Sequence, residues 1–219
     1  MSRVIAIDGP SASGKSTVAR RVAAELGRLY VDSGALYRAV TWRAMEHGVE
    51  EGDIEGVIKS LHEMEVLFRV DAGAVCFTVD GRDPGLALRT ETLNRRVSEV
   101  AATPAVRDQV VAWLRDMLPF GGLVMEGRDI GSVVFPDAEK KIFLDADPEE
   151  RARRRHAEYE GRDEASTIGN VQSSLTLRDL KDTQRKMAPL VVAEGAEILD
   201  TTSRGIDAVV EAILASVRG

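Results

Sequence analysis

The chain has 219 residues, 44% of them hydrophobic, a size that suits one compact core with a side lobe and excludes three separate domains. Its formal net charge of −7 at pH 7 excludes a nucleic-acid or anionic-membrane surface, because such partners are held by a positive field. We therefore expect small diffusible substrates, and neither nucleic acid nor a membrane as a partner.

Cysteine usage and the lengths of the apolar runs predict the compartment. Cys76 is the only cysteine, so no disulfide can form within the chain, and its neighbours VCFTV are typical of a buried strand. The apolar run VIAI before Asp8 is too short for a secretory leader, and no later run approaches the length of a membrane span. We expect a cytoplasmic protein.

The first 48 residues predict two successive strand–helix units. Residues 4–8 (VIAID) form a short β-branched run, and the segment at 15–27 repeats apolar side chains every fourth residue, as an amphipathic helix requires. Residues 29–34 (LYVDSG) predict a second strand, and the helical pattern that follows stops at Gly48, a residue typical of a helix end.

Residues 49–89 break this rhythm. A short helical pattern from Ile54 to Leu61 gives way to the strand candidates EVLFRV and VCFTVDG, with the tight turn DAGA between them. Two strands joined by a tight turn predict an antiparallel hairpin. We therefore expect one domain, with residues 1–48 and 90–219 as its core and residues 49–89 as an inserted lobe with a small antiparallel sheet.

Helices and strands alternate again over the rest of the chain. Apolar spacing predicts helices near 93–100 and 103–114, the second with Thr103 as its N-cap and Pro104 as its first residue. Further strands and a closing helix are predicted at 123–126, 141–146, 197–201 and 206–217. Apolar strands separated by helices predict an α/β fold, in which a central parallel sheet is covered on both faces in three α/β/α layers.

The stretch GPSASGKS at 9–16 fits the G-x4-G-K-[ST] pattern of a P-loop, and it lies between a predicted strand and a predicted helix. In such a loop backbone N–H groups turn inward around the phosphates, and the helix N-terminus adds partial positive charge. Lys15 then reaches the β- and γ-phosphates and Ser16 ligates Mg²⁺. The stretch predicts a nucleoside triphosphate site.

Two classes of protein could use that triphosphate. A switch that reads guanine needs an N-K-x-D motif, and the chain contains no Asn-Lys pair. A phosphotransferase needs arginines away from the loop to hold a second anionic substrate in line. The sequence favours the phosphotransferase, with a nucleotide-dependent switch as the remote alternative.

Two stretches place polar residues at the ends of predicted strands. DSGALYR carries Ser33 and Arg38, and MEGRDIGS carries Arg128 and Asp129. The carboxyl ends of parallel strands share one edge of the sheet, where ligands of such folds bind. We expect both stretches to face the P-loop.

Two later stretches are rich in arginine. Arg178, Asp182 and Arg185 share one helix face, which suits either a solvated ion-pair ladder or a grip on a sugar and a phosphate. Residues 151–166 begin as a basic helix and continue into a polar loop. This segment is either a solvated face or part of a lid, at about 151–170, whose arginines cover the transferring group.

With these motifs in place, the chain resembles the bacterial cytidylate kinases, which are P-loop nucleoside monophosphate kinases. The resemblance runs from about residue 4 to residue 214. Its most specific pieces are IDGPSASGKST, DSGALYR, VSEVAATPAVR, EGRDIGSVVFPDA, KIFLDA, ERARRR and RDLKDTQRKMAPL.

The resemblance implies transfer of the γ-phosphoryl group of ATP to CMP or dCMP, with Mg²⁺ as cofactor and the 49–89 insertion as the monophosphate-binding lobe. It assigns ATP binding to Gly9, Pro10, Ser11, Ala12, Ser13, Gly14, Lys15, Ser16 and Thr17, and catalysis to Lys15, Arg154 and Arg155. It assigns the cytosine to Ser33, Arg107, Asp129 and Arg185, the sugar to Ser98, Arg178 and Asp182, and the acceptor phosphate to Arg38 and Arg128, with Arg185 able to share it.

Further alternatives stay open at this point. A monophosphate kinase with another base preference would share these motifs. A P-loop kinase with a hydroxyl acceptor would need a carboxylate base beside that hydroxyl. Nothing in the sequence indicates an oligomer interface, so we expect a monomer.

Overall fold

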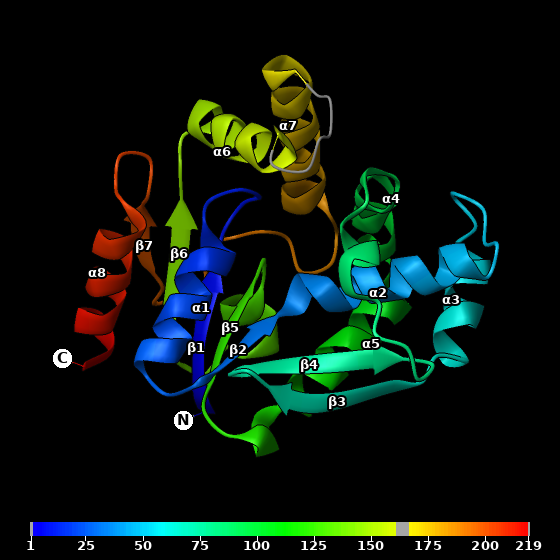
Figure 1. Ribbon diagram of the computed structural model, residues 1–219, viewed down its shortest axis with the longest axis horizontal. Coiled ribbons are helices and arrows are strands. Elements are labelled where there is room, and N and C mark those ends of the chain that lie inside the picture. Colours follow the sequence, from blue (N-terminus) through cyan, green and yellow to red (C-terminus); the bar gives the residue numbers. More distant parts are fainter. Residues whose placement is uncertain (1, 161–166, 219) are drawn as a thin grey trace.

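The computed structural model describes residues 2–160 and 167–218 and contains one seven-stranded sheet (Figure 1). Its strands are β1 (Ser2–Asp8), β2 (Leu29–Asp32), β3 (Val66–Asp71), β4 (Ala74–Val79), β5 (Leu123–Gly127), β6 (Ala138–Asp145) and β7 (Glu197–Asp200). They lie in the order β3-β4-β2-β5-β1-β6-β7, and every neighbouring pair is parallel except β3 with β4. The phosphate-loop strand β1 therefore sits inside the sheet, between β5 and β6.

Helices cover both faces of this sheet, which confirms the predicted three-layer α/β fold (Figure 1). One face carries α1 (Lys15–Glu25) and α8 (Ile206–Arg218). The other carries α2 (Ser33–Glu46), α3 (Ile54–His62), α4 (Glu91–Ala102) and α5 (Pro104–Arg115). Two further helices, α6 (Pro148–Glu160) and α7 (Ile168–Gln184), stand beyond the carboxyl ends of the strands (Figure 1).

The unbroken apolar run of β1 has its reason in this layering. Val4 and Ala6 pack into the core under α2 to α5, whereas Ile5 and Ile7 pack into the core under α1 and α8. All four are fully buried. A strand that is covered on both faces has no solvent side, so it does not alternate between apolar and polar residues.

The predicted hairpin of the 49–89 insertion is present, but it does not form a sheet of its own. β3 and β4 pair over six residues, and β4 then joins the central sheet through the single pair Tyr30–Ala74. The Tyr30 N–H donates to Gly73 O at 3.0 Å. The sequence prediction missed this junction because one backbone contact between distant segments leaves no local pattern.

Helix ends follow the predicted chemistry with one exception. Gly48 has a φ of +72° just after α2, as the predicted stop requires, and Asp32 caps the same helix by accepting the Ala35 N–H at 3.0 Å. Pro104 is the first residue of α5 and Thr103 is its N-cap residue, as predicted, but the Thr103 side chain makes no capping bond. Its hydroxyl donates to Glu99 O at 3.3 Å instead, because Thr103 also terminates α4.

Three short helical turns complete the described chain: η1 (Gly85–Arg89), η2 (Leu118–Phe120) and η3 (Ile130–Val134). η3 is wide, since the N–H of Val134 donates to Asp129 O at 3.1 Å, five residues back. Within residues 2–160 and 167–218, no helix combines the length and the apolar character that crossing a bilayer requires.

Candidate active site

The phosphate-binding loop occupies the turn between β1 and α1. Gly9 begins it with a φ of +150°, and a Cβ there would lie 2.1 Å from Leu144 O, so no other residue fits. Gly14, with a φ of +92°, is the N-cap of α1 and supplies no side chain to the first-turn amides. The N-terminus of α1 is therefore left for an anion to cap.

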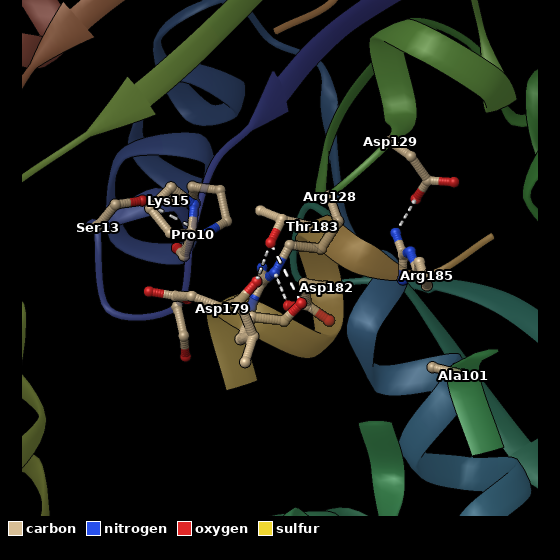
Figure 2. A network of polar contacts seen from close by, with 12 residues as sticks. Pro10, Ser13, Lys15, Ala101, Arg128, Asp129, Asp179, Asp182, Thr183 and Arg185 are labelled. Carbon is tan, nitrogen blue, oxygen red and sulfur yellow. Dashed lines mark hydrogen bonds and ion pairs between the residues drawn. The ribbon is translucent and has the colours of Figure 1, made fainter. Parts of the chain in front are cut away.

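Lys15 is held inside this loop. Its residue is 4% exposed, and Nζ donates to Pro10 O at 2.5 Å, with Ser13 Oγ at 3.4 Å (Figure 2). Burial lowers the pKa of the lysine and the charge of Arg128 lowers it further, while the carboxylates of Glu126 and Asp8 act in the opposite direction. A bound phosphate would restore the ammonium form by supplying negative charge.

One pocket of about 350 Å³ runs from the loop across the carboxyl edge of the sheet. Its lining from the loop side includes Ser11, Ala12, Gly14, Lys15, Ser16 and Thr17. The predicted acceptor residues that line it are Ser33, Arg38, Ser98, Arg128, Asp129, Arg178, Asp182 and Arg185. The structure thus brings together residues from β2, α2, α4, β5 and α7 that are far apart in sequence. Arg107 is the predicted acceptor residue outside the lining, and it lies buried behind Asp129.

The middle of the pocket gathers three guanidinium groups. Arg128 pairs with Asp182, Nε to Oδ2 at 2.9 Å (Figure 2). Burial, together with the charges of Arg128 and Arg38, lowers the pKa of Arg178 to about 9. Its Nε is buried and finds no hydrogen-bond partner within the described parts of the chain. This excess of crowded positive charge fits a phosphate dianion.

The far end of the pocket holds a carboxylate between two arginines. Asp129 makes a short ion pair with Arg107, and Arg185 Nη2 lies 3.7 Å from Asp129 Oδ1 (Figure 2). Burial raises the pKa of Asp129, and the charges of Arg107 and Arg185 oppose that rise. The Ser33 hydroxyl, on the neighbouring strand edge, donates to Glu126 O at 2.7 Å. Three of the four residues assigned to the base, Arg107, Asp129 and Arg185, therefore contact one another at this end, and Ser33 lines the same pocket.

The two arginines predicted as catalytic occupy different places. Arg155 lines the pocket, with Nη2 at 3.4 Å from Ser11 Oγ and Nη1 at 2.7 Å from Glu158 Oε2. Arg154 does not line it: its guanidinium donates to Thr201 O at 2.6 Å and to Glu150 Oε1 at 3.1 Å. Successive residues of a helix point about 100° apart, and in this structure the two guanidinium groups leave α6 in different directions.

The predicted lid at about 151–170 is built from α6 and the start of α7 as far as the structure describes it, and residues 161–166 lie outside the described residues. Its inner side packs on the phosphate loop: Ala152, Val171 and Leu175 form a small apolar cluster against Ala12. The described parts of α6 and α7 therefore contact the phosphate loop directly.

Sequence reasoning missed several residues of the pocket: Asp32, Tyr37, Arg89 and Glu126 line it as well. Asp32 is the last residue of β2 and Glu126 the last but one of β5, so the strand-end argument that selected Ser33 and Arg128 could have found them. Glu126 is buried and accepts the Tyr30 hydroxyl at 3.0 Å. Tyr37 lies against Arg107, with the guanidinium carbon 5.5 Å from the ring centre.

Comparison with known proteins agrees with this geometry. The cytidylate kinase family model matches residues 5–219. Proteins named cytidylate kinase match from Pelotomaculum thermopropionicum (47% identity, 97% of this chain and 95% of the relative) and from Geobacillus kaustophilus (43%, 96% and 94%). A solved but uncharacterised protein from Eubacterium ventriosum shares the fold at 12% identity and a TM-score of 0.50, covering 100% of this chain and 99% of its own. With a family model along nearly its whole length and relatives above 40% identity, the chain belongs to the cytidylate kinase family.

Proposed function

We propose that this chain transfers the γ-phosphoryl group of ATP to the phosphate of CMP or dCMP, giving ADP and CDP or dCDP. The observation that supports this most is the order of groups along one pocket: the phosphate loop, then three arginines, then a buried carboxylate. That order matches a donor phosphate, an acceptor phosphate and a base that carries a hydrogen-bond donor.

The chemical step needs little from the protein beyond position and charge. The acceptor is a phosphate oxygen that is already ionised at neutral pH, so no general base is required. A bond forms from this oxygen to the γ-phosphorus as the bond from the γ-phosphorus to the bridging oxygen breaks, and ADP leaves. Lys15 and Arg155 neutralise the charge on the transferring group. The lid helices exclude water that would otherwise hydrolyse ATP.

The acceptor phosphate lies among Arg38, Arg128 and Arg178 in this proposal. The resemblance placed Arg178 at the sugar, but its position beside two other guanidiniums and its unpartnered Nε, judged over the described residues, favour a phosphate contact. Ser98 and Asp182 remain for the ribose hydroxyls, and Asp182 holds Arg128 in place.

The base contacts Asp129, whose ionised carboxylate accepts from the amino group of cytosine. The charges of Arg107 and Arg185 favour the ionised form of that carboxylate. The Ser33 hydroxyl donates to the backbone oxygen of Glu126, three residues before Asp129. Uracil presents a carbonyl oxygen where cytosine has its amino group. That oxygen would face the carboxylate, so the site discriminates by repulsion as well as attraction.

The oxygen donors of the pocket suit Mg²⁺. The Ser16 hydroxyl and the carboxylates of Asp32 and Glu126 line it, and hard oxygens are the ligands that Mg²⁺ prefers. Within the residues that the structure describes, no three acidic, histidine or cysteine side chains cluster as a cage. Mg²⁺ commonly binds through few side chains together with nucleotide phosphates. When bound, it would neutralise charge on the β- and γ-phosphates.

The test is an ADP-release assay at fixed ATP with CMP, dCMP, UMP and AMP as acceptors. We expect fast release with CMP or dCMP, at least tenfold slower release with UMP and AMP, and little without an acceptor. Equal ADP release with and without CMP would overturn the transfer mechanism, and a preference for UMP or AMP would overturn the assignment of the base.

We also propose a monomeric, cytoplasmic enzyme. The support is the sequence expectation of small diffusible substrates and a lone cysteine, and a pocket whose proposed donor and acceptor groups all come from one chain. Light scattering after size exclusion tests the monomer, and a dimer mass at micromolar concentration would contradict it.

A further inference from the structure

Asp8 is a buried carboxylate that the proposed reaction does not use. It ends β1, one residue before the phosphate loop, and it is 4% exposed. Its two oxygens each accept a backbone amide: Oδ1 takes the N–H of Ile130 at 2.9 Å, and Oδ2 takes that of Gly131 at 2.7 Å. One side chain therefore satisfies two successive amides at the start of η3, more than 120 residues further along the chain.

The turn that Asp8 caps already has a carboxylate at its own N-cap. Asp129 holds that position, and aspartate is among the residues that most often cap their own helix. The Asp129 side chain makes no capping bond here. Its oxygens face Arg107 and Arg185 instead. The carboxylate of Asp8, on the neighbouring strand β1, accepts the first amides of η3 in its place.

The position of Asp8 is fixed from both sides. In the sheet it lies opposite Gly127 of β5 and Phe143 of β6. Gly127 comes two residues before Asp129, so the turn that carries Asp129 starts from a strand paired directly with β1. The turn is also tight, since a Cβ on Gly127 would lie 2.6 Å from Ser33 Oγ and 2.7 Å from a carbon of Ile130.

We propose that Asp8 is a positioning residue for base specificity: by capping η3, it leaves the carboxylate of Asp129 free to face the base pocket. This inference rests on the proposed function, in which Asp129 accepts from the amino group of cytosine. Without Asp8, two buried amides lack an acceptor, and the N-cap carboxylate of Asp129 is placed to turn back and supply one. Asp129 would then leave Arg107 and the base.

The charges around Asp8 agree with an acceptor role. Burial is the main cause that raises the pKa of Asp8, and the charge of Asp129 adds to it; the two amide bonds and the charge of Lys15 act in the opposite direction, and the net value is about 6. At neutral pH the group is thus a carboxylate with both oxygens available to accept.

The experiment compares kcat/KM for CMP with kcat/KM for UMP in the wild type, Asp8→Asn, Asp129→Asn and the double variant. Asparagine keeps one acceptor oxygen and puts a donor in place of the other. We expect Asp8→Asn to lower the CMP/UMP ratio at least tenfold. The double variant should show a ratio no lower than that of Asp129→Asn alone, because Asp8 acts through Asp129. An unchanged ratio in Asp8→Asn, or effects that multiply in the double variant, would overturn the inference.

Asp145→Asn is the matched control. Asp145 ends the neighbouring strand β6 as Asp8 ends β1, and it also accepts a backbone amide, that of Ala146 at 2.9 Å. It is exposed, and among the described residues its carboxylate accepts no amide of η3. Its CMP/UMP ratio should equal that of the wild type. General loss of folded enzyme lowers both rate constants together and leaves the ratio unchanged, so the ratio separates positioning from stability.

Amide hydrogen exchange without nucleotide tests the cap independently of the reaction. Exchange at Ile130 or Gly131, whichever amide loses its acceptor oxygen, should be at least tenfold faster in Asp8→Asn than in Asp145→Asn, and equal protection of both amides would contradict the cap. If the wild type showed no CMP preference, the proposed function would fail while this result stood. If Asp8→Asn does not fold, a pH titration of the wild type followed by NMR takes its place. The amide chemical shifts of Ile130 and Gly131 should then change with the same midpoint pH as the Asp8 carboxyl group. Midpoints that differ from that of Asp8 would contradict the inference.

Discussion

Arg151 joins the lid to the phosphate loop: its Nη1 donates to Ser11 O at 3.2 Å and lies 2.5 Å from Asp179 Oδ2 of α7. Its Nε also donates to Ala146 O at 3.1 Å. One buried guanidinium thus ties the loop, α6 and α7 together. The binding of a triphosphate to the loop and the placement of Arg178, next to Asp179, therefore share a support.

Replacing Arg151 by Ala should weaken both stability and ATP binding. The change leaves the Asp179 carboxylate in a largely buried place without its partner, which costs about 3 kcal/mol of unfolding free energy. We also expect KM for ATP to rise about tenfold because Ser11 loses its anchor. Urea unfolding and initial rates measure the two effects. Arg153→Ala is the control, since that side chain is 62% exposed and pairs only with its own helix among the described residues.

The neighbouring lid arginines should differ in their effect on turnover. Arg155→Ala should lower kcat about 100-fold, because this guanidinium lines the pocket near the loop. Arg154→Ala should lower kcat less than threefold and should lower the unfolding free energy, because it loses its bonds to Thr201. Equal losses of kcat in the two variants would show that Arg154 enters the pocket when substrate binds.

Cytidine without a phosphate separates the two roles open to Arg178. If Arg178 holds the acceptor phosphate, Arg178→Gln should raise KM for CMP by about 10- to 100-fold and leave the inhibition constant of cytidine unchanged. If it holds the sugar, both constants should rise together. Initial rates with CMP, in the absence and presence of cytidine, measure KM for CMP and the inhibition constant of cytidine on the same enzyme preparation.

The pH dependence of stability should carry a contribution from Asp8. The folded state keeps the Asp8 proton up to about pH 6, whereas the unfolded chain releases it near pH 3.8. Between those values the folded state binds more protons, so this contribution to stability is present at low pH and is lost as the pH rises through about 6. Its size is about 3 kcal/mol.

Asp8→Asn removes that titration. The unfolding free energy of the wild type minus that of the variant should therefore fall between pH 4 and pH 7, as measured by urea unfolding at several pH values. A difference that stays constant over this range would mean that burial does not perturb Asp8.

The sequence predicted the parts of the site that are encoded locally. The phosphate loop follows from glycine positions that the backbone needs, and Ser33 and Arg128 follow from the rule that parallel strands end at one edge. Arg151 was not predicted, because in a run of arginines a buried member looks like its solvated neighbours. Asp8 was not predicted either, since its partners lie more than 120 residues away and are backbone amides without a side-chain signature.

The same reasoning applies to the fold. The strands and the helices that cover the sheet were predicted from their apolar patterns, and α6 and the end of α7 from charged residues. The turn η3 was not predicted, because a wide turn has no pattern of its own. Which of Arg154 and Arg155 lines the pocket depends on the rotation of α6 about its axis, and Ala152 sets that rotation by packing against Val171 and Leu175 of α7.

The single residue pair between β2 and β4 has a mechanical consequence. Within the sheet, the β3–β4 hairpin pairs with the other five strands only through Tyr30 of β2 and Ala74 of β4. Such an attachment is the weakest line of the sheet, so thermal opening should begin there, ahead of β1 and β5. The phosphate loop follows β1, which is separated from the hairpin by β2 and β5. Changes in the length or tilt of the hairpin should therefore not strain the phosphate loop.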